Sequence, residues 1–412
     1  MPHRTGTANL PLHGGRIPPW LSSRMAAMGR VIVEAIVQEY GRHELLRRLA
    51  HPFWFQSFGA VMGMDWHSSG ITTSVIGALK RGLAPVQHEL GIYVCGGKGA
   101  QSRRTPHELL DIGEATGVDA APLVRASRLV AKIDSAAVQD GFDLYLHAFI
   151  ATADGQWSVV QQGMNEDLRE ARRYHWQSLD MPGFFESPHS AIEGRNLGAI
   201  HNLADTRAGP SRGAALDLVF DGPDRTLSVL RRFRQSGNLA LPLFPQTEAA
   251  APILPHLRMP HHHEVRASDV MLKRLHGTLA AAADAGPKDY AELLLMPGVG
   301  ARTVEALAFV AEIVHGTPSR FSDPARFSLA LGSKDGHPFP VPLKVFDETI
   351  QLLKRAVTRA RLGSSEALAA IRRLDAQARE LEARAAGPTF EAFIARERAM
   401  SEEFGGRTVL SR

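Results

Sequence analysis

Residues 143–162 read DLYLHAFIATADGQWSVVQQ, a stretch that predicts a β-hairpin. Two sets of side chains alternate along its first part, as they do on the two faces of a strand: Leu144, Leu146, Ala148 and Ile150 on one face, and Tyr145, His147 and Phe149 on the other. Asp154-Gly155 is a strong turn signal, and residues 157–162 then form the returning strand. The first half of the chain is therefore expected to contain a sheet.

Helical patterns flank this hairpin, so we expect an α+β or α/β domain in the first half of the chain. Ser22 or Ser23 can cap a helix with an apolar face. Thr105-Pro106-His107-Glu108 fits a capping box with proline at the first helical position, which predicts that a helix begins there. A second helix is predicted from Ala120 to about Ile133.

The second half of the chain is predicted to be mostly α-helical. Proline and glycine punctuate residues 206–265, which we interpret as a connecting region with one helix at residues 226–235. From Ala267 onward the pattern is nearly all helical, with a Pro-rich interruption at residues 336–342. The predicted organisation is an α/β domain at 1–205, the connecting region at 206–265, a helical domain at 266–345, and a helical arm and tail at 346–412.

The composition excludes several classes of protein. Of the 412 residues 44% are hydrophobic, and no run approaches the ~18 consecutive apolar residues of a membrane helix. Residues 1–15 lack the apolar segment of a secretory signal, so we expect a cytoplasmic protein with no membrane partner. The single cysteine, Cys95, excludes an internal disulfide framework and a Cys-based structural zinc site. A net charge of +4 is compatible with a polyanionic partner.

Residues 289–315 read DYAELLLMPGVGARTVEALAFVAEIVH and are the most informative stretch for function. A short helix ends at Met296, a tight turn follows, and a second helix begins near Ala301; this pattern resembles the helix-hairpin-helix motif that binds DNA. Two glycines let backbone N–H groups face a phosphate, and the second helix adds its positive N-terminus. The predicted contacts, which would hold the DNA backbone without reading bases, are Gly298, Val299, Gly300, Arg302 and Thr303.

Two alternatives remain for this stretch. In the first, the glycines serve only to cap helices in an ordinary turn. In the second, the chain is a base-excision glycosylase, because many of these enzymes carry such a hairpin followed by a catalytic aspartate. The glycosylase is less favoured: Arg302 stands where the bifunctional enzymes have lysine, residues 321–325 (FSDPA) lack the aspartate motif, and the cysteines of an iron–sulfur cluster are missing.

A group of polar residues in the first half suits a metal site. Asp65 and His67 point the same way in an extended segment, and Asp134 and Asp140 bracket the end of a helix. Carboxylates are the ligands that Mg²⁺ or Mn²⁺ prefers, so the predicted metal ligands are Asp65, Asp134 and Asp140. The alternatives are helix caps or Asx turns for the aspartates and a buried, hydrogen-bonded position for His67.

Histidines and basic residues complete the predicted catalytic site. An ion would orient a phosphodiester and a water for in-line hydrolysis, with His67 or His175 activating the water or protonating the leaving oxygen. The residues predicted to neutralise the scissile phosphate are Lys98, Arg172 and Arg173. The glycines of residues 96–99 (GGKG) are a weaker candidate for a phosphate cradle, because the Walker spacing is absent.

Several segments carry a resemblance to a known family: RTGTA (4–8), LPLHGG (10–15), DWHSSG (65–70), KIDSA (132–136), VVQQGM (159–164), YHW (174–176) and GSKDG (332–336). Together they resemble a prokaryotic family catalogued as domain of unknown function 763. The resemblance implies a metal-dependent DNA endonuclease that acts on bubbles, flaps or single-stranded regions during DNA repair or processing, associated with the nucleoid. A non-catalytic protein that binds such DNA structures is the alternative.

Residues 346–386 carry an apolar stripe at mixed spacings of three and four, with a break at Gly363-Ser364-Ser365. The break predicts two antiparallel helices. We expect them to join two chains into a homodimer, which would place two hairpins on one DNA. The alternative is that the stripe packs on the body of its own chain.

Overall fold

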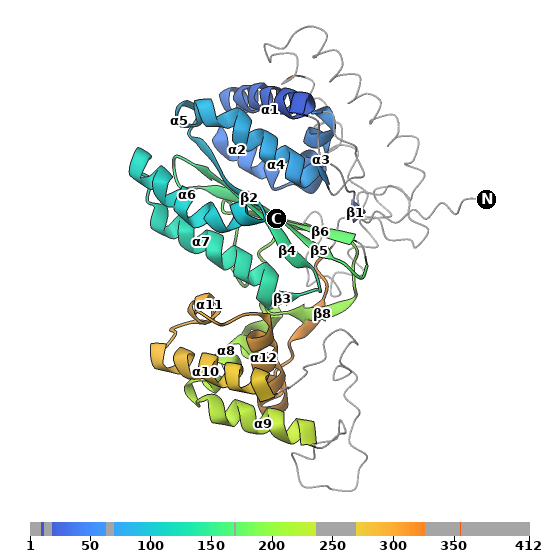
Figure 1. The fold of residues 1–412 in the computed structure, drawn as a ribbon, viewed down its shortest axis with the longest axis vertical. Coiled ribbons are helices and arrows are strands. Elements are labelled where there is room, and N and C mark those ends of the chain that lie inside the picture. The colour runs from blue at the N-terminus through green and yellow to red at the C-terminus, as the bar shows by residue number, and fades with distance from the viewer. Residues whose placement is uncertain are drawn as a thin grey trace, which may run out of the picture.

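A computed structural model of the chain describes residues 10–11, 19–62, 70–168, 170–235, 269–325 and 355. Figure 1 shows an antiparallel sheet between two layers of helices, with a further group of helices beyond one layer. Helices α1 to α5 cover one face of the sheet, and α6 and α7 cover the other. Helices α8 to α12 pack beyond α7 and share the hydrophobic core of that second face.

The main sheet has the strand order β1-β6-β5-β4-β2, with β7 paired to β6. Its strands are β1 (Leu10–Pro11), β2 (Ile92–Lys98), β4 (Asp143–Thr152), β5 (Trp157–Asn165), β6 (Glu170–Gln177) and β7 (Ala191–Glu193). Every pairing is antiparallel, so the first half is α+β rather than the α/β alternative. The predicted hairpin is confirmed as β4 and β5, which pair from Ala151 and Trp157 onward.

Strand β4 is buried on both faces from Leu146 to Thr152. One face is apolar up to Ile150, and the other carries Phe149 and the buried, hydrogen-bonded His147. Leu146, Ala148 and Ile150 share a face as predicted and pack with helices α1 to α4. Leu144 departs from the prediction, because the β4–β5 register shifts between Leu144 and Leu146. The extra residue of this bulge reverses the alternation, so Leu144 packs with the opposite core and Tyr145 takes the face of Leu146.

The first helical layer contains α1 (Pro19–Tyr40), α2 (Arg42–Leu49), α3 (Pro52–Val61), α4 (Gly70–Leu83), a 3₁₀ turn at Ala84–Val86 and α5 (Gln87–Leu90). Helix α1 begins before the predicted caps Ser22 and Ser23. The helix begins at Pro19. Proline suits a first helical turn, because the N–H that it lacks would have no acceptor within the helix there. The Ser22 hydroxyl instead accepts a hydrogen bond from Arg81 of α4, at 2.6 Å.

The second layer contains α6 (Ala100–Thr116) and α7 (Ala120–Lys132), which continues into a π-helical turn at Ile133–Ala137. The predicted second helix is confirmed as α7. The predicted start at Thr105 is wrong, since α6 begins at Ala100 and contains Pro106. Pro106 cannot donate to the carbonyl of Ser102, and the Thr105 hydroxyl donates to that carbonyl instead, at 2.8 Å.

The second half contains a 3₁₀ turn at Thr206–Ala208, α8 (Gly209–Phe220), α9 (Pro223–Gln235), α10 (Asp269–Ala285), α11 (Tyr290–Leu295) and α12 (Ala301–His315). The helix predicted in the connecting region is confirmed as α9, which begins three residues earlier than expected. The expectation of a single helix there is wrong, because α8 also lies in this region. A small sheet of β3 (Val138–Gln139), β8 (Ala199–Asn202) and β9 (Arg320–Ser322) ties this half to the first. The domain boundaries stay predictions.

Several predictions fall outside the described residues: Asp65, His67, the Pro-rich interruption at 336–342, and the stripe at 346–386 except Arg355. The homodimer therefore stays a prediction. Among the helices that the structure describes, none combines the length and apolarity needed to span a bilayer.

Candidate functional site

The connection between α11 and α12 is a type II turn followed by a helix cap. The N–H of Val299 donates to the carbonyl of Met296 at 3.2 Å, with Pro297 and Gly298 at the two central positions. Gly298 has φ +84°, which this turn requires at its third residue. The carbonyl of Gly300 then accepts the N–H groups of residues 303 and 304, each at 3.0 Å, and begins α12.

The two glycines of this turn are needed for different reasons. At Gly298 a side chain would meet both the positive φ and the Oγ1 of Thr278 on α10, which lies 3.0 Å from the Cβ position. Gly300 has φ −146°, an extended conformation that any residue adopts, and its Cβ position has nothing within 4 Å. The described fold therefore requires glycine at Gly298 but not at Gly300.

The predicted DNA contacts divide into surface and core residues. Gly298 and Arg302 are exposed and Gly300 is half-buried, all at the start of α12. Val299 is only 1% exposed and Thr303 only 6%, so both side chains belong to the core. The first N–H groups of α12 have no acceptor within the helix, and the helix dipole adds a partial positive charge beside them.

Side chains from the end of α7 and from β3 hold this connection in place. The Lys132 ammonium donates to the carbonyl of Val299. The Gln139 side chain donates to the carbonyls of Ala136 and Ala301, each at 2.9 Å. Burial lowers the pKa of Lys132. The α11–α12 connection is therefore fixed to the strand and helix that precede the main hairpin.

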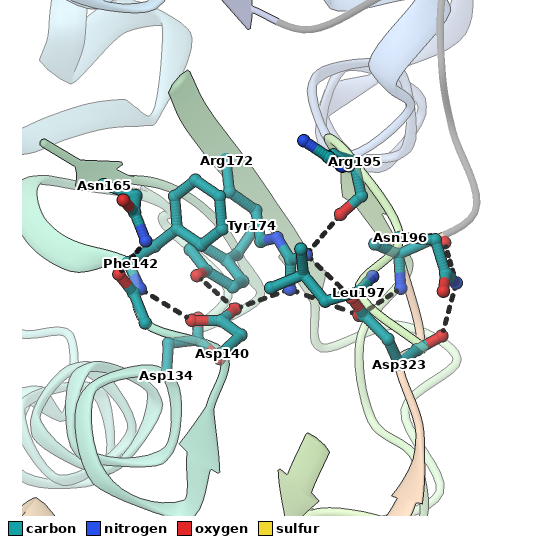
Figure 2. A network of polar contacts seen from close by, with 12 residues as sticks. Asp134, Asp140, Phe142, Asn165, Arg172, Tyr174, Arg195, Asn196, Leu197 and Asp323 are labelled. Atoms are coloured by element: carbon teal, nitrogen blue, oxygen red, sulfur yellow. Dashed lines mark hydrogen bonds and ion pairs between the residues drawn. The ribbon is translucent and has the colours of Figure 1, made fainter. Parts of the chain in front are cut away.

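Arg172 lies at the centre of a buried charge network, shown in Figure 2. Its guanidinium donates to Asp140 at 2.8 Å and to both oxygens of Asp323, at 2.7 and 3.2 Å. The Tyr174 hydroxyl donates to Asp140 at 2.6 Å. Burial raises the pKa of Asp140, while the positive charge of Arg172 opposes that shift. Because the Arg172 side chain is 0% exposed, its charge is compensated inside the protein.

Asp134 lies in the π-helical turn and accepts three hydrogen bonds. The donors are the Gln161 amide at 2.5 Å, the Trp176 indole at 2.9 Å and the His189 imidazole at 2.6 Å. Sequence reasoning missed His189, which lies between β6 and β7 and belongs to no periodic pattern. Only the fold brings it to Asp134, with its ring 4.2 Å from that of Trp176 between centroids.

The fold does not bring the other predicted catalytic residues of the sheet together at one site. Arg173 is buried on the opposite face from Arg172, where it pairs with Glu193 and donates to Gln56 at 2.7 Å. His175 is buried, and burial together with Arg173 lowers its pKa well below the usual value, so the ring is neutral. Lys98 is exposed, with its ammonium 5.5 Å from the centre of the Tyr145 ring.

The described carboxylates of the predicted metal site have protein donors on their oxygens, as the contacts of Asp134 and Asp140 show. Within the described ranges no group of three or more histidine, cysteine, aspartate or glutamate side chains is arranged to hold a metal ion. Asp134 and Asp140 therefore do not fit an Mg²⁺ or Mn²⁺ ion in this arrangement. The metal site stays a prediction.

Gly96, which lies within β2, is needed for close packing. The N–H of Gly96 donates to the Glu108 carboxylate at 2.7 Å, and Lys80 binds the same carboxylate at 2.7 Å. A Cβ at Gly96 would lie 2.3 Å from the carbonyl oxygen of His147. An acidic side chain therefore occupies the position that a phosphate would need at the N–H of Gly96.

Comparison with known proteins gives one informative match. The family model described as "Protein of unknown function (DUF763)" matches residues 6–341, which include all described strands and helices from β1 to β9. No curated protein and no solved structure matches the chain.

Proposed function

This chain belongs to the DUF763 family, and because that description assigns no activity, we propose a function from the geometry: the chain binds DNA through the sugar–phosphate backbone. The α11–α12 connection is the binding element and acts as a helix-hairpin-helix. The main observation that supports this proposal is the open space around Gly300. The fold does not require glycine there, whereas a phosphate approaching the N–H groups at the start of α12 does require an uncovered backbone.

Charge around Gly300 favours the same partner. Arg302 is exposed in the first turn of α12, and the Lys132 ammonium lies beneath the turn on the carbonyl of Val299. A negative group at this position gains from both cations and from the helix dipole. None of these contacts reads a base edge, so the proposal is binding that depends on salt and not on sequence.

Binding of labelled DNA at several salt concentrations tests the proposal. Two unrelated duplexes of equal length are expected to bind with affinities within a few-fold of each other. The logarithm of the association constant is expected to fall with the logarithm of salt concentration, with a slope of about −0.9 for each phosphate contacted. Absence of binding at low salt, or binding to one duplex alone with little salt dependence, would contradict the proposal.

Metal-dependent cleavage is a separate proposal, which rests on the family resemblance and on the sequence. Purified protein is incubated with labelled bubble, flap and single-stranded DNA, with Mn²⁺ or with a chelator. Cutting that requires Mn²⁺ is the result expected of the endonuclease, with Asp65 among its predicted ligands. Binding without cutting would favour the non-catalytic alternative and leave the role of the hairpin intact.

A further inference from the structure

The outer face of α7 carries a row of positive charges. Arg125, Arg128 and Lys132 are spaced three and four residues apart, which places them on one side of the helix. Arg125 and Arg128 are exposed, and Lys132 is half-buried. No acidic residue lies between the N-cap Asp119 and the π-helical Asp134. We call these three residues the α7 row.

The two exposed arginines of the α7 row lack the ion pairs that several other helical arginines make. Arg30, Arg48 and Arg225 each pair with a carboxylate four residues away, at 2.7, 2.6 and 2.5 Å. Within the described part of the chain, Arg125 and Arg128 make no such ion pair. Like charges at this spacing destabilise a helix by about 0.2–0.5 kcal/mol, and a bound anion would remove that repulsion. Unpaired arginines also occur in this part of the chain on α9, at Arg231 and Arg232, but of these two groups the α7 row alone is joined to the α11–α12 connection, through Lys132.

The α7 row begins at the α11–α12 connection. Lys132 donates to the carbonyl of Val299, and Figure 1 shows the C-terminal end of α7 next to the segment that joins α11 to α12. From Lys132 to Arg125 the helix rises by about 10 Å, at about 1.5 Å for each residue. One strand of B-DNA rises by about 3.4 Å along the helix axis for each phosphate, so a row parallel to that axis covers the rise of about three phosphates.

We propose that the α7 row continues the DNA-binding surface, so that the strand held at Gly300 runs along α7 and places consecutive phosphates against Arg128 and Arg125. This inference rests on the proposed function, and it adds the path that the DNA backbone takes across the protein. Lys132 acts as a positioning residue, because its ammonium is bound to the turn. Arg125 and Arg128 act as phosphate contacts.

The test compares two double variants of the full chain. Arg125→Ala/Arg128→Ala is expected to weaken binding of a random-sequence duplex about tenfold and to make the salt slope shallower by about 1.8, since two phosphates are lost at about 0.9 each. Arg231→Ala/Arg232→Ala removes the same charge from exposed positions of α9, which packs against α10 and α12. This control is expected to keep the slope of the unaltered protein.

Further variants separate the possible outcomes. Arg125→Lys/Arg128→Lys keeps both charges and is expected to keep the salt slope. If the alanine variant keeps the slope, or loses no more than the α9 control, the inference is wrong while the hairpin proposal survives. If the unaltered protein binds no DNA, both are wrong. Equal binding of a single-stranded RNA would show that the surface takes any phosphate backbone, and it would overturn the assignment to DNA.

Discussion

Replacing Gly300 by aspartate is expected to weaken DNA binding at least tenfold relative to replacing it by asparagine, with no loss of stability. Both side chains have the same shape and both are among the best N-cap residues. Aspartate adds a negative charge at the position proposed for the phosphate. Two like charges about 4 Å apart repel by about 1–4 kcal/mol between bulk water and a protein surface, and tenfold corresponds to about 1.4 kcal/mol.

Stability and binding are expected to change in opposite directions in this pair of variants. A negative charge at a helix N-terminus stabilises the helix by about 0.3–1 kcal/mol, so Gly300→Asp should melt at the same temperature as Gly300→Asn or higher. The space around the Cβ position supports this, since nothing lies within 4 Å of it. Fluorescence anisotropy and thermal melts measure the two effects. Equal DNA affinities of the two variants would contradict the proposed position of the phosphate.

Replacing Arg172 by leucine is expected to destabilise the protein by about 3–5 kcal/mol at pH 7. The change leaves Asp140 and Asp323 buried together without the guanidinium that binds both. Arg207→Leu is the matched control, because Arg207 also pairs with an aspartate, at 2.9 Å, but its side chain is 43% exposed. The control is expected to lose less than about 1 kcal/mol. Chemical denaturation of the three proteins measures the difference.

The loss of unfolding free energy caused by Arg172→Leu is expected to become smaller as the pH falls from 7 towards 4. Without the guanidinium, the positive charge that opposes the effect of burial on the pKa of Asp140 is gone, so this pKa lies further above its value in the unfolded chain. A carboxyl with a raised pKa stabilises the fold while protonated, and that contribution is lost as pH rises through the raised pKa. A loss that stays constant over this range, or no loss at pH 7, would contradict the role assigned to the network.

The β4–β5 hairpin could be predicted because its signals are local. The alternation of residues 146–150 and the turn at Asp154-Gly155 lie within a few residues of each other. The bulge at Leu144 could not be predicted, since it depends on the register with β5 rather than on a residue type. The same limit applies to α6, where Pro106 is accommodated because a neighbouring hydroxyl replaces its missing N–H.

The candidate site shows the same difference between local and distant information. The turn at Gly298 could be predicted from four consecutive residues, and its two glycines could be told apart only when Thr278 of α10 was placed beside one of them. Arg172 suggested a phosphate contact because a sequence shows a charge without its partner. That partner, Asp323, lies 151 residues further along the chain. His189 reaches Asp134 across 55 residues, with no pattern to indicate it.

The distance along the chain between Arg172 and Asp323 also sets an order of events during synthesis. A ribosome that adds about 5–20 residues each second needs about 8–30 s to make the intervening 151 residues. Until Asp323 is made, Asp140 is the only one of the two described carboxylate partners of Arg172 that exists, and β8 has no β9 to pair with. The last pairing to form is therefore one that joins the earliest half of the chain to its latest described strand. A nascent chain arrested before Asp323 leaves the ribosome is expected to remain a substrate for chaperones and proteases.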